Sequence, residues 1–451
     1  MSSHKIIRDV IHGYIPISEQ DLEIIDTPTF QRLKRIRHTT INSVYPCANH
    51  TRFEHSLGVM YLGERAFRTI EEKHGKGLDA SFKITVRYAC LLHDVGHAPL
   101  SHLGEFFYDK DDLRLRVIEL LHEKEPASKL DHKELKLHGS EHELCSCAVA
   151  LDKYGEQLSK NGVDLELMCR MITGVDYSSS GDETKNAMID ILNSGIDVDK
   201  LDYILRDSQS SGAKLVTIDL ERLISAYEVG DRGLIFSGKA LSAVANLVHG
   251  RAAQYQWLVN HHISVYTDVL YKRYILHLID NDSKIREFFS YDSIANQLKD
   301  DYDLVGLMRS HMTDEYLKDL NNQINNRKYH KALWKTPLDF KEIVDDDDKQ
   351  DDIITLAKKF EKDPHKLENK IISENPGEHL NEGDFFIALA DLKSYNPIGD
   401  STISIKINGR TRKFHSIFVE NILQDKYSQQ IPFIFYRNDD KIKESLLRIL
   451  T

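Results

Sequence analysis

The chain of 451 residues has few cysteines, and they form no familiar pattern. The five are Cys47, Cys90, Cys145, Cys147 and Cys169. An odd number without a C-x-x-C pair fits neither a disulfide framework nor a thiolate zinc site. We therefore expect small buried side chains in helices, in a protein of the reducing cytoplasm.

Long apolar runs and a basic surface are also missing. No stretch approaches the roughly 18 apolar residues of a membrane span, and the opening sequence MSSHKIIRDV lacks the apolar segment of a signal peptide. The 59 basic and 71 acidic residues leave a net charge of −12. A nucleic-acid coat needs a basic surface for counterion release, so nucleic-acid binding is the less favoured option. The expectation is a cytoplasmic protein without a membrane segment.

Helical patterns dominate the first three quarters of the chain. We predict a strand or hairpin over residues 5–17 with its turn at His12-Gly13, then a helix over 18–37 that Pro28 interrupts. Further helices are predicted at 84–93, 113–122, 142–153, 165–173, 187–192 and 198–207, and one or two long helices at 241–277. The sequence therefore predicts a mainly α fold.

The last part of the chain has a different texture. The acidic stretch 345–352 is typical of a solvated loop or a helix start. Asn408-Gly409 is a two-residue hairpin signal. Strand-like segments occur at 385–392, 401–407, 413–418 and 431–436. We predict a helical domain over 1–335 and a small α+β region over 336–451, for oligomerisation or regulation.

Histidine is abundant, with 22 in the chain and seven between His93 and His142. An adjacent pair, His93-Asp94, ends an apolar segment, where burial is costly unless both side chains are satisfied. A divalent metal accepts both ligand types. The alternative is a capped helix end with a hydrogen-bonded core histidine. The nearby His97 and His102 favour the metal.

Two other segments, 198–207 and 27–53, have charged residues in a pattern that bears on metal or substrate binding. If 198–207 is helical, one stripe holds Asp199, Asp202, Tyr203 and Arg206. Such a stripe is usually a solvated face, but the apolar residues between its members indicate that the helix packs on the core. The stripe can then edge a cavity and supply a metal-binding carboxylate. A basic patch over 27–53 suits an anionic substrate, or else is ordinary surface coverage; it consists of Arg32, Lys34, Arg35, Arg37 and Arg52.

The order His55, His93-Asp94, Asp199 resembles the metal signature of the HD-domain phosphohydrolases. Residues 24–59, IIDTPTFQRLKRIRHTTINSVYPCANHTRFEHSLGV, resemble the entry block of the HD-domain deoxynucleoside triphosphate (dNTP) triphosphohydrolases. The segments LLHDVGHAPLSH (91–102) and GIDVDKLDYILRDS (195–208) are similar to the next two blocks. The likeness covers about residues 5–280 and implies a helical HD-domain core.

The resemblance implies roles for individual residues and a reaction. A divalent metal ion (Mn, Mg, Fe, Zn or Ni) would be held by His55, His93, Asp94 and Asp199. The substrate would be contacted by Arg52 and Lys200 at the triphosphate, Tyr203 at the deoxyribose, Asp207 at its 3′-hydroxyl, and His38 and Tyr266. Proton transfer would fall to His97, His102 or His142, with Glu105 orienting a histidine. The reaction is hydrolysis at the α-phosphorus to deoxynucleoside and triphosphate.

Four departures from the family pattern bear on specificity. His38 replaces a glutamine that helps to read the 3′-hydroxyl, and Lys34 replaces an arginine of a regulatory guanine site. Glu105 replaces an aspartate, and Asp268 in Val265-Tyr266-Thr267-Asp268 stands where the family often has histidine. Base and sugar preference therefore stay open. The expected partners are a dNTP substrate, a regulatory nucleotide and further copies of the chain, as a dimer or tetramer.

Two other functions are compatible with the same residues. One is a different HD phosphohydrolase that acts on a nucleoside monophosphate, a cyclic nucleotide or an alarmone. The other is a nucleotide-sensing or nucleic-acid-binding regulator without turnover. A pure sensor would not need the metal ligands together with His97 and His142, so hydrolysis is the favoured function.

Overall fold

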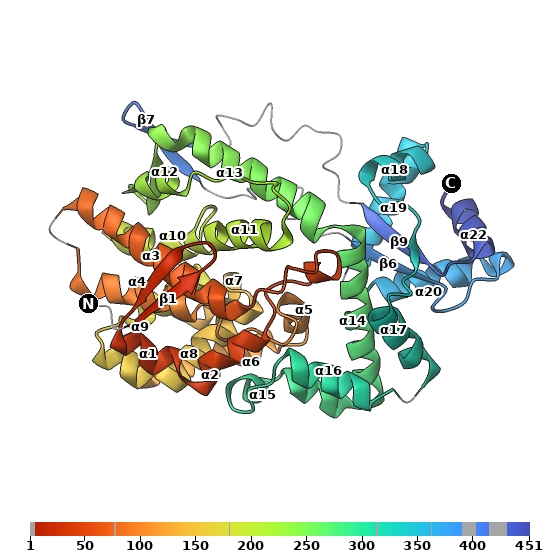
Figure 1. Ribbon diagram of the computed structural model, residues 1–451, viewed down its shortest axis with the longest axis horizontal. Coiled ribbons are helices and arrows are strands. Elements are labelled where there is room, and N and C mark those ends of the chain that lie inside the picture. The colour runs from red at the N-terminus through yellow and green to blue at the C-terminus, as the bar shows by residue number, and fades with distance from the viewer. Residues whose placement is uncertain are drawn as a thin grey trace.

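The computed structural model describes residues 5–75, 78–179, 181–312, 314–361, 363–389, 403–414 and 431–451 (Figure 1). A large helical body holds the N-terminal two thirds of the chain, and a smaller body of helices and short strands lies at its side. The predicted mainly α fold is confirmed. None of the helices in the described ranges is long and apolar enough to cross a membrane.

The N-terminal segment is a hairpin followed by short helical pieces. Strands β1 (Lys5–Asp9) and β2 (Gly13–Ile17) pair antiparallel, as predicted. The helix predicted over 18–37 is interrupted at Pro28 as predicted, into α1 (Glu19–Ile25) and α2 (Pro28–Gln31), but it continues as a 3₁₀ turn (Arg32–Arg35) and ends before residue 37. Pro28 occupies the first position of α2 after the Thr27 cap, where its missing N–H costs nothing.

The helical body surrounds four helices that carry the site: α3 (Arg52–His74), α4 (Ala80–Leu92), α8 (Glu141–Lys160) and α11 (Val198–Ser211). The other helices of this body are α5 (His102–Glu105), α6 (Lys110–Lys124), α7 (His132–Leu137), α9 (Leu165–Thr173), α10 (Glu183–Leu192), α12 (Leu220–Ser225) and α13 (Leu241–Gln254). The shorter predicted helices fall within these elements, except that His93 lies one residue beyond α4 as its C-cap. Four cysteines are buried as expected, whereas Cys47 is exposed and lies outside a helix.

The segment predicted as one or two long helices forms two. A π turn (Tyr255–Val259) separates α13 from α14 (His262–Asn281). The helices that follow are α15 (Tyr291–Ala295), α16 (Asp301–Ser310), α17 (Glu315–Asn326), α18 (Pro337–Ile343), α19 (Asp347–Lys359), α20 (Pro364–Glu374) and α22 (Asp440–Leu450). Asp346 caps α19 through the Lys349 backbone, so the acidic stretch is a helix start.

Strands from the middle and from the C-terminal part of the chain share one small sheet. Its order is β3 (Tyr227–Val229), β4 (Leu234–Ser237), β7 (Ser404–Ile407), β8 (Arg410–Lys413), with β4 and β7 parallel. Asn408 and Gly409 connect β7 to β8, and both have positive φ, as a tight hairpin requires. Figure 1 places β7 beside α12 and away from β6 and β9.

A second sheet has the order β5 (Lys331–Ala332), β9 (Pro432–Tyr436), β6 (Phe385–Leu389). The predicted strand at 413–418 is shifted, because β8 ends at Lys413; residues 390–392, 401–402 and 415–418 of the predicted strands lie outside the described residues. The domain boundary predicted at residue 335 stays a prediction. Two strand pairs, β4 with β7 and β5 with β9, join residues before this boundary to residues after it.

Candidate functional site

Three helix ends bring the predicted metal ligands together. His55 lies in the first turn of α3, which a capping box between Thr51 and Glu54 begins. His93 caps the C-terminus of α4, and Asp94 follows in the turn. Asp199 lies in the first turn of α11, after the Asp197 cap. We call His55, His93, Asp94 and Asp199 the metal quartet.

The atoms of the quartet converge. His55 Nε2 lies 3.0 Å from Asp199 Oδ1 and 3.5 Å from Asp94 Oδ2. His93 Nε2 lies 3.4 Å from Asp94 Oδ1 and 3.8 Å from Asp199 Oδ1. Neither buried Nε2 atom makes a well-aligned hydrogen bond within the described ranges. Two orphaned imidazole nitrogens facing two carboxylates are a donor set that a divalent transition metal accepts.

The far sides of both imidazoles are held by hydrogen bonds. His93 Nδ1 donates to the Cys90 carbonyl at 2.8 Å, and His55 Nδ1 donates to Asp202 Oδ2 at 2.7 Å. Such bonds fix the tautomer in which Nε2 offers its lone pair to an ion. Each ring is therefore oriented for metal binding by the fold itself.

The carboxylates of the quartet decide the protonation of His55. Burial lowers the pKa of His55, but the nearby Asp199 and Asp202 carboxylates outweigh it and raise that pKa to about 10, so without an ion both ring nitrogens carry protons, and a bound ion would take the place of the proton on Nε2. Burial raises the pKa of Asp94, yet Arg52 and His93 hold it well below its usual range. The carboxylates of Asp94 and Asp199 therefore stay ionised, as metal binding requires.

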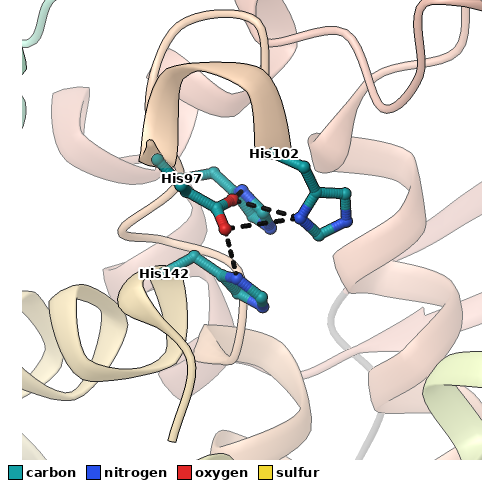
Figure 2. Close-up of side chains that lie close together, drawn as sticks. His97, His102 and His142 are labelled. Carbon is teal, nitrogen blue, oxygen red and sulfur yellow. Dashed lines mark hydrogen bonds and ion pairs between the residues drawn. The ribbon is translucent and has the colours of Figure 1, made fainter. Parts of the chain in front are cut away.

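Beside the quartet, three histidines surround one carboxylate (Figure 2). Glu105 Oε1 lies 2.6 Å from His97 Nδ1 and 3.3 Å from His102 Nδ1, and its Oε2 accepts from His142 Nδ1 at 2.9 Å. The rings of His97 and His142 stack at 4.2 Å. We call these four residues the histidine cluster. Its His97 Nε2 lies 3.0 Å from Asp94 Oδ1, which joins it to the metal quartet.

Two histidines of the cluster, His142 and His97, differ in protonation near neutral pH. Burial lowers the pKa of His142, but the charge and hydrogen bond of Glu105 raise it to about 9. Burial and then Arg52 lower the pKa of His97 to about 4. Near neutral pH, His142 therefore carries a proton that it can give, while His97 is neutral.

The predicted phosphate contacts already have acidic partners. Arg52 is buried and donates from Nη1 to Asp94 Oδ2 at 2.8 Å and from Nε to Ser101 Oγ at 3.1 Å. Lys200 Nζ pairs with Asp197 Oδ2 at 2.5 Å. Arg52 thus contacts a member of the metal quartet directly. Lys200 follows Asp199 in sequence, but its ammonium group contacts Asp197, the N-cap of α11, instead of the quartet.

The predicted sugar contacts lie together, with partners that the sequence reasoning missed. Asp207 Oδ1 lies 2.8 Å from His50 Nε2 and 3.6 Å from His38 Nδ1, and Gln254 Nε2 donates to Asp207 Oδ2 at 2.8 Å. The ring of His38 lies 4.5 Å from that of His55 and 6.4 Å from that of Tyr203. His50 stands in the entry block and could have been found there; no motif marks Gln254.

Tyr266 is not brought to this group. Its ring is fully buried, and its hydroxyl donates to Gln323 Oε1 at 2.5 Å. Phe435 packs against it at 4.5 Å, and His330 stacks on it at 5.9 Å. The structure therefore gives Tyr266 a packing role where α14 meets the C-terminal sheet, and the predicted substrate contact lacks support.

Gly58 allows α11 to approach α3 next to His55. A Cβ at this position would lie 2.0 Å from Asp202 Oδ1 and 2.6 Å from Arg206 Nη2. We expect Gly58→Ala to lower the free energy of unfolding by about 3 kcal/mol, because the added carbon displaces a buried ion pair. Urea denaturation measures this loss.

A helical glycine with open space serves as the control. A Cβ on Gly306, within α16, meets nothing within 4 Å, so Gly306→Ala should leave stability unchanged or raise it by up to about 1 kcal/mol. Equal stability of the two variants would contradict the close approach at Gly58.

Comparison with known proteins agrees with this arrangement. The HD domain model matches residues 52–174, and the HD associated region model matches residues 218–381. An uncharacterized protein of Methanocaldococcus jannaschii is 29% identical over 79% of this chain and 66% of its own length. A protein named deoxynucleoside triphosphate triphosphohydrolase SAMHD1 homolog, from Dictyostelium discoideum, is 30% identical over 68% of this chain and 54% of its own length.

The chain thus spans about half to two thirds of the length of these relatives. The fold is also similar to the crystal structure of a phosphohydrolase from Bacteroides thetaiotaomicron, with a TM-score of 0.66, 20% identity, and coverage of 97% of this chain and 100% of the other. The metal quartet and the histidine cluster fall within the matched HD domain, except for Asp199. The candidate site therefore lies in an HD domain, which an HD associated region follows along the chain.

Proposed function

We propose that this protein hydrolyses dNTPs at the α-phosphorus and releases deoxynucleoside and intact triphosphate. One observation carries the proposal: His97 Nε2 lies 3.0 Å from Asp94 Oδ1, so a group of proton-transfer residues adjoins the metal quartet. Phosphoryl hydrolysis needs neutralised charge and a proton donor side by side. The name of the Dictyostelium relative, a deoxynucleoside triphosphate triphosphohydrolase homolog, favours dNTPs as the substrate class.

The four members of the metal quartet would hold one divalent ion, which when bound neutralises charge on the phosphate oxygens. Arg52 would exchange its partner Asp94 for a phosphate oxygen, since a guanidinium makes charge-assisted hydrogen bonds to carboxylates and phosphates alike. His142, kept protonated by Glu105, would give its proton to the departing 5′-oxygen. His102, whose side chain is 62% exposed, would line the solvent side.

The sugar and base would lie on the His38 side of the quartet. His50 and Gln254 hold the Asp207 carboxylate, which would accept the 3′-hydroxyl, and Tyr203 would pack on the ring. A cavity of about 310 Å³ is lined by Arg37 and Leu100, among others. Arg37 precedes His38 in sequence, and Leu100 precedes Ser101, the partner of Arg52. We assign the base to this cavity. The regulatory nucleotide and the homo-oligomer stay predictions.

Product analysis tests the proposal. The protein is incubated with each dNTP and NTP plus Mn²⁺ or Mg²⁺, and the products are separated by ion-exchange chromatography. Triphosphate and deoxynucleoside in equal amounts are expected, with dNTPs preferred over NTPs. Release of pyrophosphate or inorganic phosphate would reject the reaction and favour another HD phosphohydrolase activity.

A further inference from the structure

The N-terminal hairpin reaches the metal quartet through its turn. Asp9 Oδ1 accepts from the backbone N–H groups of Ile11 at 2.8 Å and His12 at 2.9 Å, which fixes the turn between β1 and β2. Asp9 Oδ2 accepts from Arg206 Nη1 at 2.8 Å. The turn is therefore tied to α11, the helix that supplies Asp199.

The imidazole of His12 is enclosed and points at one buried carboxylate. Its side chain is 1% exposed, and its ring lies 5.5 Å from the ring of Tyr61 on α3. His12 Nε2 lies 2.6 Å from Asp202 Oδ1. Arg206 donates to both oxygens of Asp202, at 2.8 and 2.9 Å, so the carboxylate is ionised and the imidazole nitrogen is the donor.

Each oxygen of Asp202 accepts two hydrogen bonds. Oδ1 receives His12 and Arg206, and Oδ2 receives His55 Nδ1 and Arg206. The side chain is fully buried, so a lost donor is not replaced by solvent. Without His12, Oδ1 would be one partner short, and rotation of the carboxylate to recover one would carry Oδ2 away from His55.

We propose that His12 is a positioning residue of the metal site: it holds Asp202 in the orientation that aims His55 Nε2 at the ion. The inference rests on the metal-binding role of His55 in the proposed function. His12 lies outside the residues that match the HD domain. The N-terminal hairpin would therefore contribute to the metal site although it is not part of the matched domain. Loss of such an outer partner is expected to weaken metal binding about tenfold.

Direct metal binding by the full chain tests this role without any nucleotide. Metal-stripped protein is titrated with Mn²⁺ in a calorimeter. His12→Gln keeps a donor toward Asp202, whereas His12→Phe keeps only the packing against Tyr61. We expect His12→Phe to bind about tenfold more weakly and His12→Gln to stay close to the unmodified chain. His12→Leu replaces His12→Phe if that variant does not fold, as judged by thermal unfolding in EDTA.

Tyr14→Ala is the matched control on the same hairpin. Tyr14 is 64% exposed and its ring is covered by Arg8, so its loss should leave Mn²⁺ affinity unchanged. Unmodified affinity in His12→Phe overturns the proposal. Equal losses in His12→Phe and His12→Gln also overturn it, since a donor toward Asp202 would then not preserve the affinity, and so does an equal loss in Tyr14→Ala. If the unmodified chain binds no Mn²⁺, the metal assignment of the proposed function fails first.

Discussion

His93→Ala or Asp94→Ala is expected to remove both the bound metal and the hydrolytic activity. His93 supplies an orphaned Nε2, and Asp94 is the carboxylate that both imidazoles and Arg52 face. A metal contributes several kcal/mol to stabilising phosphoryl charge, and 4 kcal/mol corresponds to roughly 1,000-fold in rate. Metal analysis by mass spectrometry and product chromatography measure the two losses on the same preparations.

His365→Ala is the control for replacing a histidine. His365 pairs with Glu382 at 3.0 Å on the surface of α20, with its side chain 41% exposed. Metal content and rate should both stay unchanged. Full activity after either change in the quartet would overturn the site assignment.

His142→Ala is expected to keep the metal and lose about 100- to 10,000-fold in rate. His142 contacts Glu105 at 2.9 Å and stacks on His97, and within the described residues no hydrogen bond joins it to a member of the metal quartet. Its removal therefore deletes a proton donor and leaves the metal ligands in place. Loss of metal together with rate would show instead that the histidine cluster itself holds an ion.

The rate should also depend on pH through the same side chain. The pKa of His142 is raised to about 9, so the protonated donor is present below that pH, at neutral pH included, and is lost as the pH rises through 9. The rate should therefore be flat near pH 7 to 8 and fall on the alkaline side. In Glu105→Gln the carboxylate that raises this pKa is gone, and the alkaline limb should move to lower pH. An alkaline limb that stays in place would exclude His142 as the donor.

The metal quartet could be predicted because its residue types and order are visible in the chain. His93 and Asp94 are adjacent, and the blocks around His55 and Asp199 supplied the other two ligands. His12, His50 and Gln254 could not be assigned their roles, because each acts through a partner about 50 to 200 positions away, such as Asp202 or Asp207. Only packing brings these pairs together.

The differences between the predicted and the observed fold have local and non-local causes. The break at Pro28 was predicted, but the 3₁₀ form of Arg32–Arg35 was not, and this turn ends because Ile36 is extended. Periodicity marked Tyr266 as part of a helix but could not tell which neighbours would cover it. The parallel pairing of β4 with β7 joins residues about 170 positions apart, which no local pattern reports.

The two sheets bear on how this chain can change over evolution. The chain places β6 in the C-terminal sheet, crosses to add β7 and β8 to the helical body, and returns to place β9 between β5 and β6. A gene shortened at the predicted boundary would leave β4 with a bare edge and β5 without its neighbour. Recombination is therefore not expected to add or remove the C-terminal residues without exposing strand edges in both bodies. The two bodies are expected to be inherited as one unit.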